Sequence, residues 1–259
     1  MTQQKVLPYL DSAHPLAIAH RGFSRDGLEN SLVAFQAALE LGYQYVETDL
    51  NTTSDGVAMV FHDSTLDRTT DRDGAIAELP YAEVEKARIG GREPIATLPE
   101  FVAALPAARF NIDVKDAGSV APLVRVIEEA GLHERICVAS FSERRRRQVL
   151  AGLSRPVASS PGKSLLAAYF FLSPWLPAFL TRALMRGVNV LQIPRRHNRL
   201  ELVTAKTVAR AHSLGLKVHV WTIDEPAEMH ELFDLGVDGI MTDRADLLAG
   251  VMRERGYWT

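Results

Sequence analysis

Charged and polar side chains recur at the ends of short apolar runs in this chain. The runs PLAIA, YQYVETDL, VAMVF and RFNIDVK carry or directly precede His20, Arg21, Glu47, Asp49, His62, Asp113 and Lys115. Residues two apart on a strand point to the same face. Glu47 therefore shares a face with Asp49, and Asp113 shares one with Lys115, so the runs would present these charges together.

This combination of residue types indicates phosphoryl chemistry. Three carboxylates from neighbouring strand ends would form a hard, oxygen-rich pocket, which favours one Mg²⁺ or Ca²⁺ ion over metals that prefer thiolates. Two flanking histidines can supply a general acid and a general base, while Arg21 and Lys115 add fixed positive charge. A divalent cation, cationic side chains and a histidine pair are what reaction at an anionic phosphoryl group requires.

An alternation of strand-like and helix-like stretches would position these residues. Eight runs are typical of strands, at residues 15–20, 43–50, 109–115, 135–140, 155–159, 188–193, 216–222 and 238–242. Helix-period stretches at 30–41, 120–130 and 204–214 each end at a glycine suited to a helix C-cap. Eight strand–helix units predict an α/β fold, a (β/α)₈ TIM barrel, whose active site lies at the C-terminal strand ends. The seventh and eighth runs end in Trp221-Thr222 and Thr242-Asp243.

One stretch breaks the alternation. Residues 57–62 predict an extra strand, and residues 63–95 form a polar, turn-rich excursion before the next helix at Leu98. No linker rich in Pro, Gly or Ser divides the sequence. We therefore expect one barrel domain over residues 1–259, with a small insertion after the second strand at about 57–97.

The charged residues also have structural interpretations. A strand-end histidine can be satisfied by backbone groups, and Asp113 and Lys115 could form a salt bridge across the strand face, a role compatible with catalysis. A Glu-x-Asp pair is often a solvated strand edge. Inside a barrel strand, however, an unpaired charge is expensive to bury, which favours metal binding by Glu47 and Asp49.

The composition of the chain limits which binding partners and which cellular location are expected. The chain has 29 Lys+Arg against 32 Asp+Glu, so no broad positive field for nucleic acid is implied. The single cysteine, Cys137, lies in the apolar run ICVAS, where a buried, inert thiol is expected. The first fifteen residues lack the long apolar stretch of a secretory signal, which predicts a cytoplasmic protein.

The motifs resemble those of glycerophosphodiester phosphodiesterases. The segment IAHRGFSRDGLENSLVAFQAALELGYQYVETDLNTTSDGVAMVFHDSTLDRTT is similar to the N-terminal signature of that family, and the similarity resumes at EPIATLPEFVAAL, NIDVK, VASF and VWTIDEPAEMHELFDLGVDGIMTDRADLL. It covers most of the chain outside residues 158–203. The excursion at 63–95 corresponds to the family's barrel insertion.

The resemblance implies a role for each matching residue. His20 and His62 would be the general acid/base pair, and Glu47, Asp49 and Asp113 would hold one divalent metal ion, Mg²⁺ or Ca²⁺. Arg21 and Lys115 would face the phosphate, Glu29 would match a substrate-binding acid, and Trp221 would wall the glycerol side. The sequence departs from the family pattern at Leu28, Ser31, Asp113, which replaces the more frequent Glu, and Asp224, which replaces Asn.

The implied reaction is hydrolysis of a glycerophosphodiester to a glycerol phosphate and an alcohol. One alternative is a lipid phosphodiesterase of the lysophospholipase D or sphingomyelinase D type, which would use the same histidines and metal on lysophospholipids or sphingolipids. Another is a non-catalytic module that binds phosphoesters. The natural headgroup, the choice between the two metals and the oligomeric state are left open.

Two segments have no role in this reaction. Residues 164–184 are strongly apolar, but Pro174 and Pro177 interrupt them, and the unbroken apolar run is far shorter than the ~20 residues that span a bilayer. They would form either an outer barrel helix or a lid that contacts membrane or an acyl chain, which would make the protein membrane-associated. The arginine run at 144–147 is interpreted as a solvated helix face with Glu143 as a partner.

Overall fold

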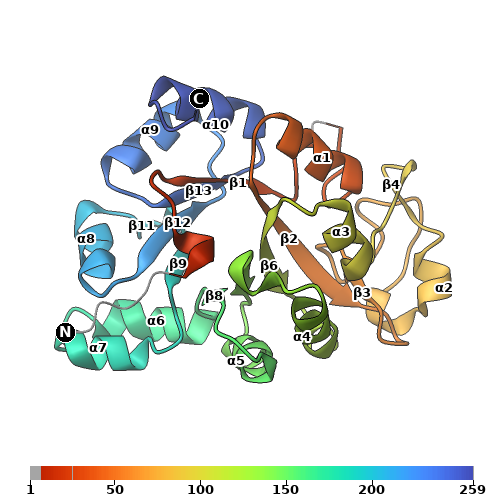
Figure 1. Ribbon diagram of the computed structural model, residues 1–259, viewed down its shortest axis with the longest axis horizontal. Helices are drawn as coiled ribbons and strands as arrows, with labels where there is room; N and C mark the ends of the chain where they lie inside the picture. Colours follow the sequence, from red (N-terminus) through yellow and green to blue (C-terminus); the bar gives the residue numbers. More distant parts are fainter. Residues whose placement is uncertain (1–6, 25, 259) are drawn as a thin grey trace.

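Eight parallel strands form a nearly closed barrel in the computed structural model, which describes residues 7–24 and 26–258 (Figure 1). Around the barrel the strands follow the order β8-β7-β6-β2-β1-β13-β12-β9. Their bounds are β1 (Leu16–His20), β2 (Tyr45–Thr52), β6 (Arg109–Val114), β7 (Ile136–Ala139), β8 (Ala158–Ser159), β9 (Val190–Pro194), β12 (Lys217–Trp221) and β13 (Gly239–Thr242). The predicted TIM barrel is confirmed, and all eight predicted strands are present.

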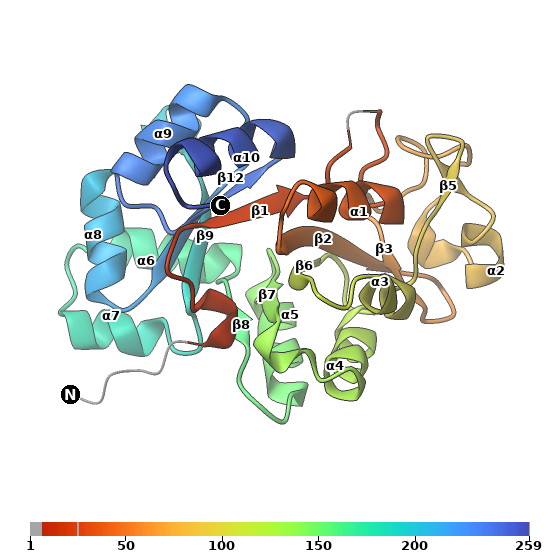
Figure 2. The same cartoon turned by 45° about the horizontal axis from the view of Figure 1, so that its top comes forward.

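Helices cover the outside of the barrel (Figures 1 and 2). They are α1 (Leu32–Glu40), α3 (Leu98–Ala104), α4 (Val120–Glu129), α5 (Glu143–Gly152), α6 (Lys163–Leu172), α7 (Ala178–Leu184), α8 (Ala205–Ser213), α9 (Pro226–Asp234) and α10 (Ala245–Glu254). Side chains cap several first turns: Ser31 accepts from the Ala34 amide, and Thr97 and Glu100 form a reciprocal capping box. The helices predicted at 30–41, 120–130 and 204–214 are α1, α4 and α8.

The apolar core lies mainly between the barrel strands and the helices. The strand residues Val46, Phe110, Val138 and Leu191 belong to one large buried cluster that continues onto every long helix around them, for example at Phe35 of α1. A second cluster fills the barrel at the N-terminal ends of the strands, where the 3₁₀ helix Pro8–Leu10 packs. Cys137 lies there, and burial raises the pKa of its thiol, so it is the inert cysteine that was predicted.

The predicted insertion follows β2 and projects from one side of the barrel (Figure 2). It contains β3 (Ala58–Val60), which pairs antiparallel with β2, the short helices Ile76–Glu78 and α2 (Tyr81–Val84), and the pair β4 (Arg88–Ile89) and β5 (Glu93–Pro94). Although the excursion is polar overall, its few apolar residues form a separate buried cluster around Met59, Leu66 and Ile89. The insertion is therefore anchored by a small core of its own.

The barrel ladder is interrupted between β8 and β9, which are the two ends of the strand order. The Asn189 amide donates to the Ser159 carbonyl at 3.0 Å, and the Asn189 side chain accepts from the Ser159 amide at 3.2 Å. Arg146 of α5 donates to the Ser159 hydroxyl at 2.9 Å and to the Gly187 carbonyl at 3.1 Å. A buried side chain thus ties together the strands that the ladder does not join.

This role corrects the interpretation of residues 144–147 as a solvated helix face. Arg144 and Arg147 are exposed, but Arg146 is buried and forms a two-bond ion pair with Glu143, at 2.9 and 2.6 Å. Arg145 is half-buried and donates to the Ser140 hydroxyl. A run of identical residues gave no indication of which member turns inward. Arg146 does so at the seam, where the Ser159 hydroxyl and the Gly187 carbonyl accept its hydrogen bonds.

Replacing Arg146 with Met should destabilise the fold, because the substitution leaves the partly buried Glu143 carboxylate without its main partner and breaks the seam. We expect the free energy of unfolding in urea to fall by about 3 to 5 kcal/mol, the cost of removing one partner from a buried ion pair. Arg147→Met is the matched control, since Arg147 contacts the same Glu143 from an exposed position. It should cost less than about 1 kcal/mol. Equal losses in both variants would contradict the assignment.

Helices α6 and α7 form the crossover between β8 and β9 on the outside of the barrel (Figure 1). They bury Leu165, Tyr169 and Thr181 against the body of the protein. Arg210 of α8 donates to the carbonyls of Ser173 and Leu176, at 2.8 and 3.0 Å, which fixes the turn between the two helices. Within residues 7–24 and 26–258, none of the helices has the length and apolar character needed to cross a membrane.

Candidate active site

The turn after β1 places His20 and Arg21 over the end of the barrel. His20 lies beside Glu47 in the β1–β2 register, and the Arg21 amide donates to the Glu47 carbonyl at 3.0 Å. Arg21 and Gly22 both adopt positive φ angles, 55° and 86°. A Cβ at Gly22 would lie 2.7 Å from the carbonyl carbon of Ala34 in α1, so only glycine permits this close turn.

Each of the two histidines is held by an aspartate at Nδ1. His20 Nδ1 lies 2.6 Å from Asp243, which follows β13, and His62 Nδ1 lies 2.5 Å from Asp63. A carboxylate at Nδ1 fixes the ring orientation and leaves Nε2 available for proton transfer. His20 Nε2 is 3.7 Å from a Glu47 oxygen. Burial would lower the pKa of His20, but the charges of Glu47 and Asp243 outweigh it and raise the pKa above 6.5.

The loop that carries His62 is fixed from two sides. The Asn51 amide nitrogen, on β2, lies within hydrogen-bond distance of the carbonyls of Phe61, His62 and Asp63, at 3.0 to 3.1 Å. Arg68, from the insertion, donates to Asp63 and lowers the pKa of that carboxyl to about 2. The insertion therefore orients one of the two histidines.

Asp49, Asp113 and Lys115 form a buried ionic cluster at the ends of β2 and β6. Asp49 and Asp113 are direct neighbours in the strand register, and the Lys115 ammonium lies 2.9 Å from Asp49 and 2.6 Å from Asp113. Arg21 Nε lies 3.4 Å from the other Asp49 oxygen. Burial would raise the pKa of Asp49, but Lys115 and Arg21 outweigh it and hold the pKa below its usual value.

The residues predicted to hold a metal ion are adjacent, but they are not arranged as a finished site. Across the described part of the chain, no group of three or more His, Cys, Asp or Glu side chains has the geometry of one. The donors nevertheless fit a hard cation. Asp113 Oδ1 is buried without a hydrogen-bond partner, and burial together with the neighbouring Asp49 raises the pKa of Glu47. The positive side chains around Glu47, Asp49 and Asp113 are therefore too few to keep all three carboxyls ionised, and a bound cation would supply the missing charge.

Glu29 lies at the edge of this cluster rather than alone in a substrate pocket. It accepts from Arg21 at 2.9 Å and from Arg68 at 2.6 and 3.1 Å. Burial would raise the pKa of Glu29, but the two guanidinium groups outweigh it and lower the pKa. In this arrangement Glu29 links the insertion to Arg21 and sets the direction of the Arg21 side chain.

Trp221, at the end of β12, forms an aromatic wall with Phe141, which follows β7. Their ring centroids are 6.1 Å apart, and the ammonium groups of Lys115 and Lys163 lie 5.2 and 4.3 Å from the Phe141 ring. Phe141 is 44% exposed, an unusual position for a large apolar side chain. The sequence reasoning missed it, although its place directly after a strand was a usable signal.

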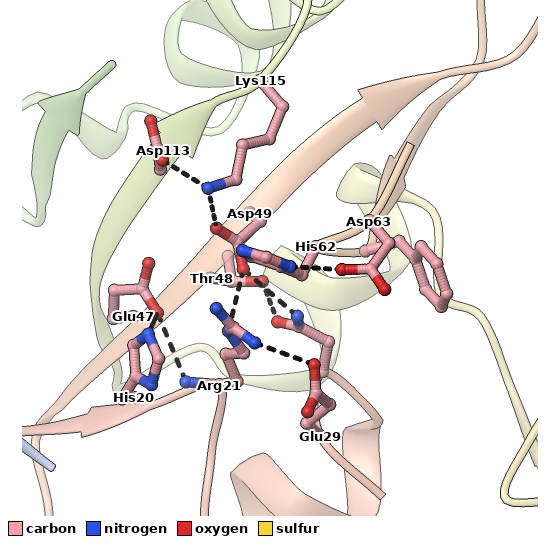
Figure 3. A network of polar contacts seen from close by, with 12 residues as sticks. His20, Arg21, Glu29, Glu47, Thr48, Asp49, His62, Asp63, Asp113 and Lys115 are labelled. Atoms are coloured by element: carbon pink, nitrogen blue, oxygen red, sulfur yellow. Dashed lines mark hydrogen bonds and ion pairs between the residues drawn. The ribbon is translucent and has the colours of Figure 1, made fainter. Parts of the chain in front are cut away.

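The structure thus brings together all nine predicted site residues at one end of the barrel. Figure 3 shows His20 next to Glu47, and His62 with Asp63 on the other side of Asp49. The sequence reasoning noted Asp243 as a polar strand end without giving it a role, and it missed Asp63 and Arg68. Asp224 also acts indirectly: its Oδ1 accepts from the Thr242 hydroxyl and the Asp243 amide, both at 2.9 Å.

A TIM barrel with paired histidines, buried carboxylates and two cations at its C-terminal strand ends defines a barrel enzyme suited to anionic phosphate esters. Residues 20–247 match the glycerophosphoryl diester phosphodiesterase family. A probable glycerophosphodiester phosphodiesterase 2 of Mycobacterium tuberculosis is 43% identical over 94% of this chain and 92% of its own length. The chain therefore belongs to the glycerophosphoryl diester phosphodiesterase family, and the predicted enzyme class, a phosphoric diester hydrolase, is confirmed.

Two further comparisons extend this result. A lysophospholipase D of Mus musculus is 26% identical, with 87% of this chain and 82% of that protein covered. An Oleispira antarctica phosphodiesterase, whose structure was solved in complex with the product sn-glycerol-3-phosphate, has a TM-score of 0.76 at 22% identity, with 93% of this chain and 97% of that chain covered. The structural match agrees with the barrel fold.

Asp243 should orient His20, so Asp243→Asn should lower kcat by about 100-fold while the protein stays folded, because an Asn at this position can favour the wrong histidine tautomer. The measurement is steady-state turnover of glycerophosphocholine. Asp224→Asn is the matched control, since an amide oxygen can accept the same two bonds as Asp224 Oδ1, and near-normal turnover is expected. Full activity of Asp243→Asn would show that Asp243 does not position His20.

Proposed function

We propose that this protein cleaves glycerophosphodiesters to a glycerol phosphate and an alcohol, with His20 and His62 as the general acid/base pair. The observation that carries the proposal is the matching arrangement of the two histidines, each oriented by an aspartate at Nδ1 and placed beside one buried ionic cluster. The family and the product bound to the Oleispira antarctica relative support this substrate class.

In the proposed mechanism, Arg21 and Lys115 neutralise the charge of the bound phosphate, and Phe141 and Trp221 flank the alcohol or glycerol part. One histidine accepts the proton of the glycerol 2-hydroxyl, whose oxygen then attacks phosphorus. The other histidine donates a proton to the departing alkoxide as its bond to phosphorus breaks. Water then opens the resulting cyclic phosphate, with the two histidines exchanging roles.

We further propose that Glu47, Asp49 and Asp113 hold one divalent cation, Mg²⁺ or Ca²⁺. Three observations support this proposal: the ligands are carboxylate oxygens, which hard cations prefer, one Asp113 oxygen is buried without a partner, and the pKa of Glu47 is raised. When bound, such an ion supplies Lewis-acid polarisation of a non-bridging phosphoryl oxygen. Lys115 now lies between Asp49 and Asp113, so it must share these carboxylates with a cation.

Lysophospholipids are the second candidate substrate class. The similarity to a relative named a lysophospholipase D favours it. The scissile diester would be the same, so the site chemistry does not distinguish the two classes. Comparing kcat/KM for glycerophosphocholine with kcat/KM for lysophosphatidylcholine distinguishes the two classes. The glycerophosphodiester assignment requires the value for glycerophosphocholine to be larger.

Replacing either histidine with Ala should lower kcat by about 10² or more, since positioned proton transfer contributes roughly 10² to 10⁴. The measurement is turnover of glycerophosphocholine by His20→Ala and His62→Ala. His14→Ala is a suitable control, because His14 is exposed and lies before β1, far along the strand from His20. If both site variants kept near-normal turnover, the acid/base assignment would be wrong.

Chelation should remove activity, and Mg²⁺ or Ca²⁺ should restore it. Asp113→Asn should weaken metal binding by about tenfold or more in isothermal titration calorimetry, because an amide carries no charge. Asp73→Asn, which changes an exposed carboxylate in the insertion, should bind metal normally. His20→Ala should also bind metal while lacking turnover, which separates metal binding from proton transfer. Undiminished binding by Asp113→Asn would remove Asp113 from the ligand set.

A further inference from the structure

Helices α6 and α7 expose an unusual group of large apolar side chains. The exposed fractions are 77% for Phe171, 45% for Leu172, 86% for Trp175, 71% for Phe179 and 43% for Leu180. We call these five residues the α6–α7 apolar patch. Elsewhere in the described residues, the large exposed apolar side chains are Val33, Phe141 and Leu200, which lie on separate elements. Isolated exposed apolar residues are ordinary, but a contiguous group indicates a contact surface.

The patch faces solvent because of how the two helices are fixed. Leu165 and Tyr169 occupy the buried side of α6, and Arg210 secures the α6–α7 turn through Ser173, Leu176 and the Thr181 hydroxyl. These contacts leave the opposite side free.

The patch is also far from the candidate active site. Lys163, at the start of α6, lies next to Phe141 at the mouth of the site. A helix that follows a barrel strand runs back toward the strand N-termini. The end of α6 and the turn at Trp175 are therefore at the other end of the barrel. This placement argues against the lid that the sequence left open.

The patch lies in a segment with no acidic residue. Residues 144–200 contain no Asp or Glu and include ten arginines, although the whole chain has a formal net charge of −3. Four of these arginines pair with acids outside the segment, Arg146 and Arg147 with Glu143, and Arg195 and Arg196 with Glu201. Arg186, two residues after the end of α7, is exposed. Exposed aromatic residues next to basic residues are the combination that inserts into the headgroup region of anionic bilayers.

We propose that the α6–α7 apolar patch, together with Arg186, docks on an anionic lipid bilayer. Phe171, Trp175 and Phe179 enter the interface, while Arg186 contacts the headgroup phosphates. A second copy of the chain fits less well, because a two-fold interface would bring the same basic segments face to face. This surface goes beyond the proposed reaction and does not depend on the catalytic roles of the site residues.

Co-sedimentation with vesicles tests the proposal. The vesicles are phosphatidylcholine alone, or phosphatidylcholine with about one-third phosphatidylglycerol. The wild type should bind the anionic vesicles, bind the neutral ones at least about fivefold less, and be released as added salt screens the charges. The triple variant F171S/W175S/F179S should lower the partition coefficient at least about tenfold. Arg186→Glu should lower it about fivefold on anionic vesicles only.

Leu200→Ser is the matched control, since it removes a 63% exposed apolar side chain outside the patch, and its partitioning should equal that of the wild type. Trp175→Ser alone should give an intermediate loss if the triple variant folds poorly. Turnover of glycerophosphocholine should be unchanged in the patch variants, which separates this proposal from the proposed function. Equal partitioning of wild type and patch variants would overturn the proposal, as would a dimer in light scattering that the triple variant dissolves.

Discussion

The candidate site depends on burying several charges together at one end of a closed barrel. Taking a charge out of water costs several kcal/mol unless a partner compensates, so none of Asp49, Asp113 and Lys115 could be buried alone. The register of β2 and β6 places the two aspartates side by side, and Lys115 reaches both. Arg21 lies on the other side of Asp49 and supplies a second positive charge to the cluster. The cluster is therefore stable as ion pairs and still presents charge to an incoming phosphate.

The histidines are oriented by groups from widely separated parts of the chain. Asp243 comes from the end of the last strand, and Asp63 and Arg68 come from the insertion. Asp243 is placed by the pairing of β13 with β1, and Asp63 and Arg68 are placed by the insertion that follows β2. Arg146 secures the seam between β8 and β9 from α5. β13 is hydrogen-bonded directly to β1, so the contact between Asp243 and His20 rests on that ladder, whereas Arg146 stabilises the two ends of the strand order.

The sequence predicted the barrel and the residues that meet at its end, because both follow from strand periodicity and from residues two apart sharing a face. It anticipated the salt bridge between Asp113 and Lys115 as a structural alternative, and the structure contains that bridge. It could not predict that Lys115 also contacts Asp49, since spacing along one strand does not determine a contact to the next. Asp63 and Phe141 were missed for a similar reason: their roles depend on loop paths. Arg146 was misinterpreted because burial within a run of identical charges depends on which helix face meets the seam.

Two of the four departures from the family pattern, at Asp224 and Asp113, differ in how much they change the site. Asp224 in place of Asn changes little, because one side-chain oxygen accepts both of its bonds, from Thr242 and from Asp243, and either residue type supplies that oxygen. Asp113 in place of Glu is a larger change. The shorter side chain leaves Oδ1 buried without a partner while Oδ2 contacts Lys115. A ligand that reaches less far toward a cation can be completed by a bridging water. In the proposed metal site, Asp113 is therefore the carboxylate expected to affect the choice of metal most, because it is the one that departs from the family pattern.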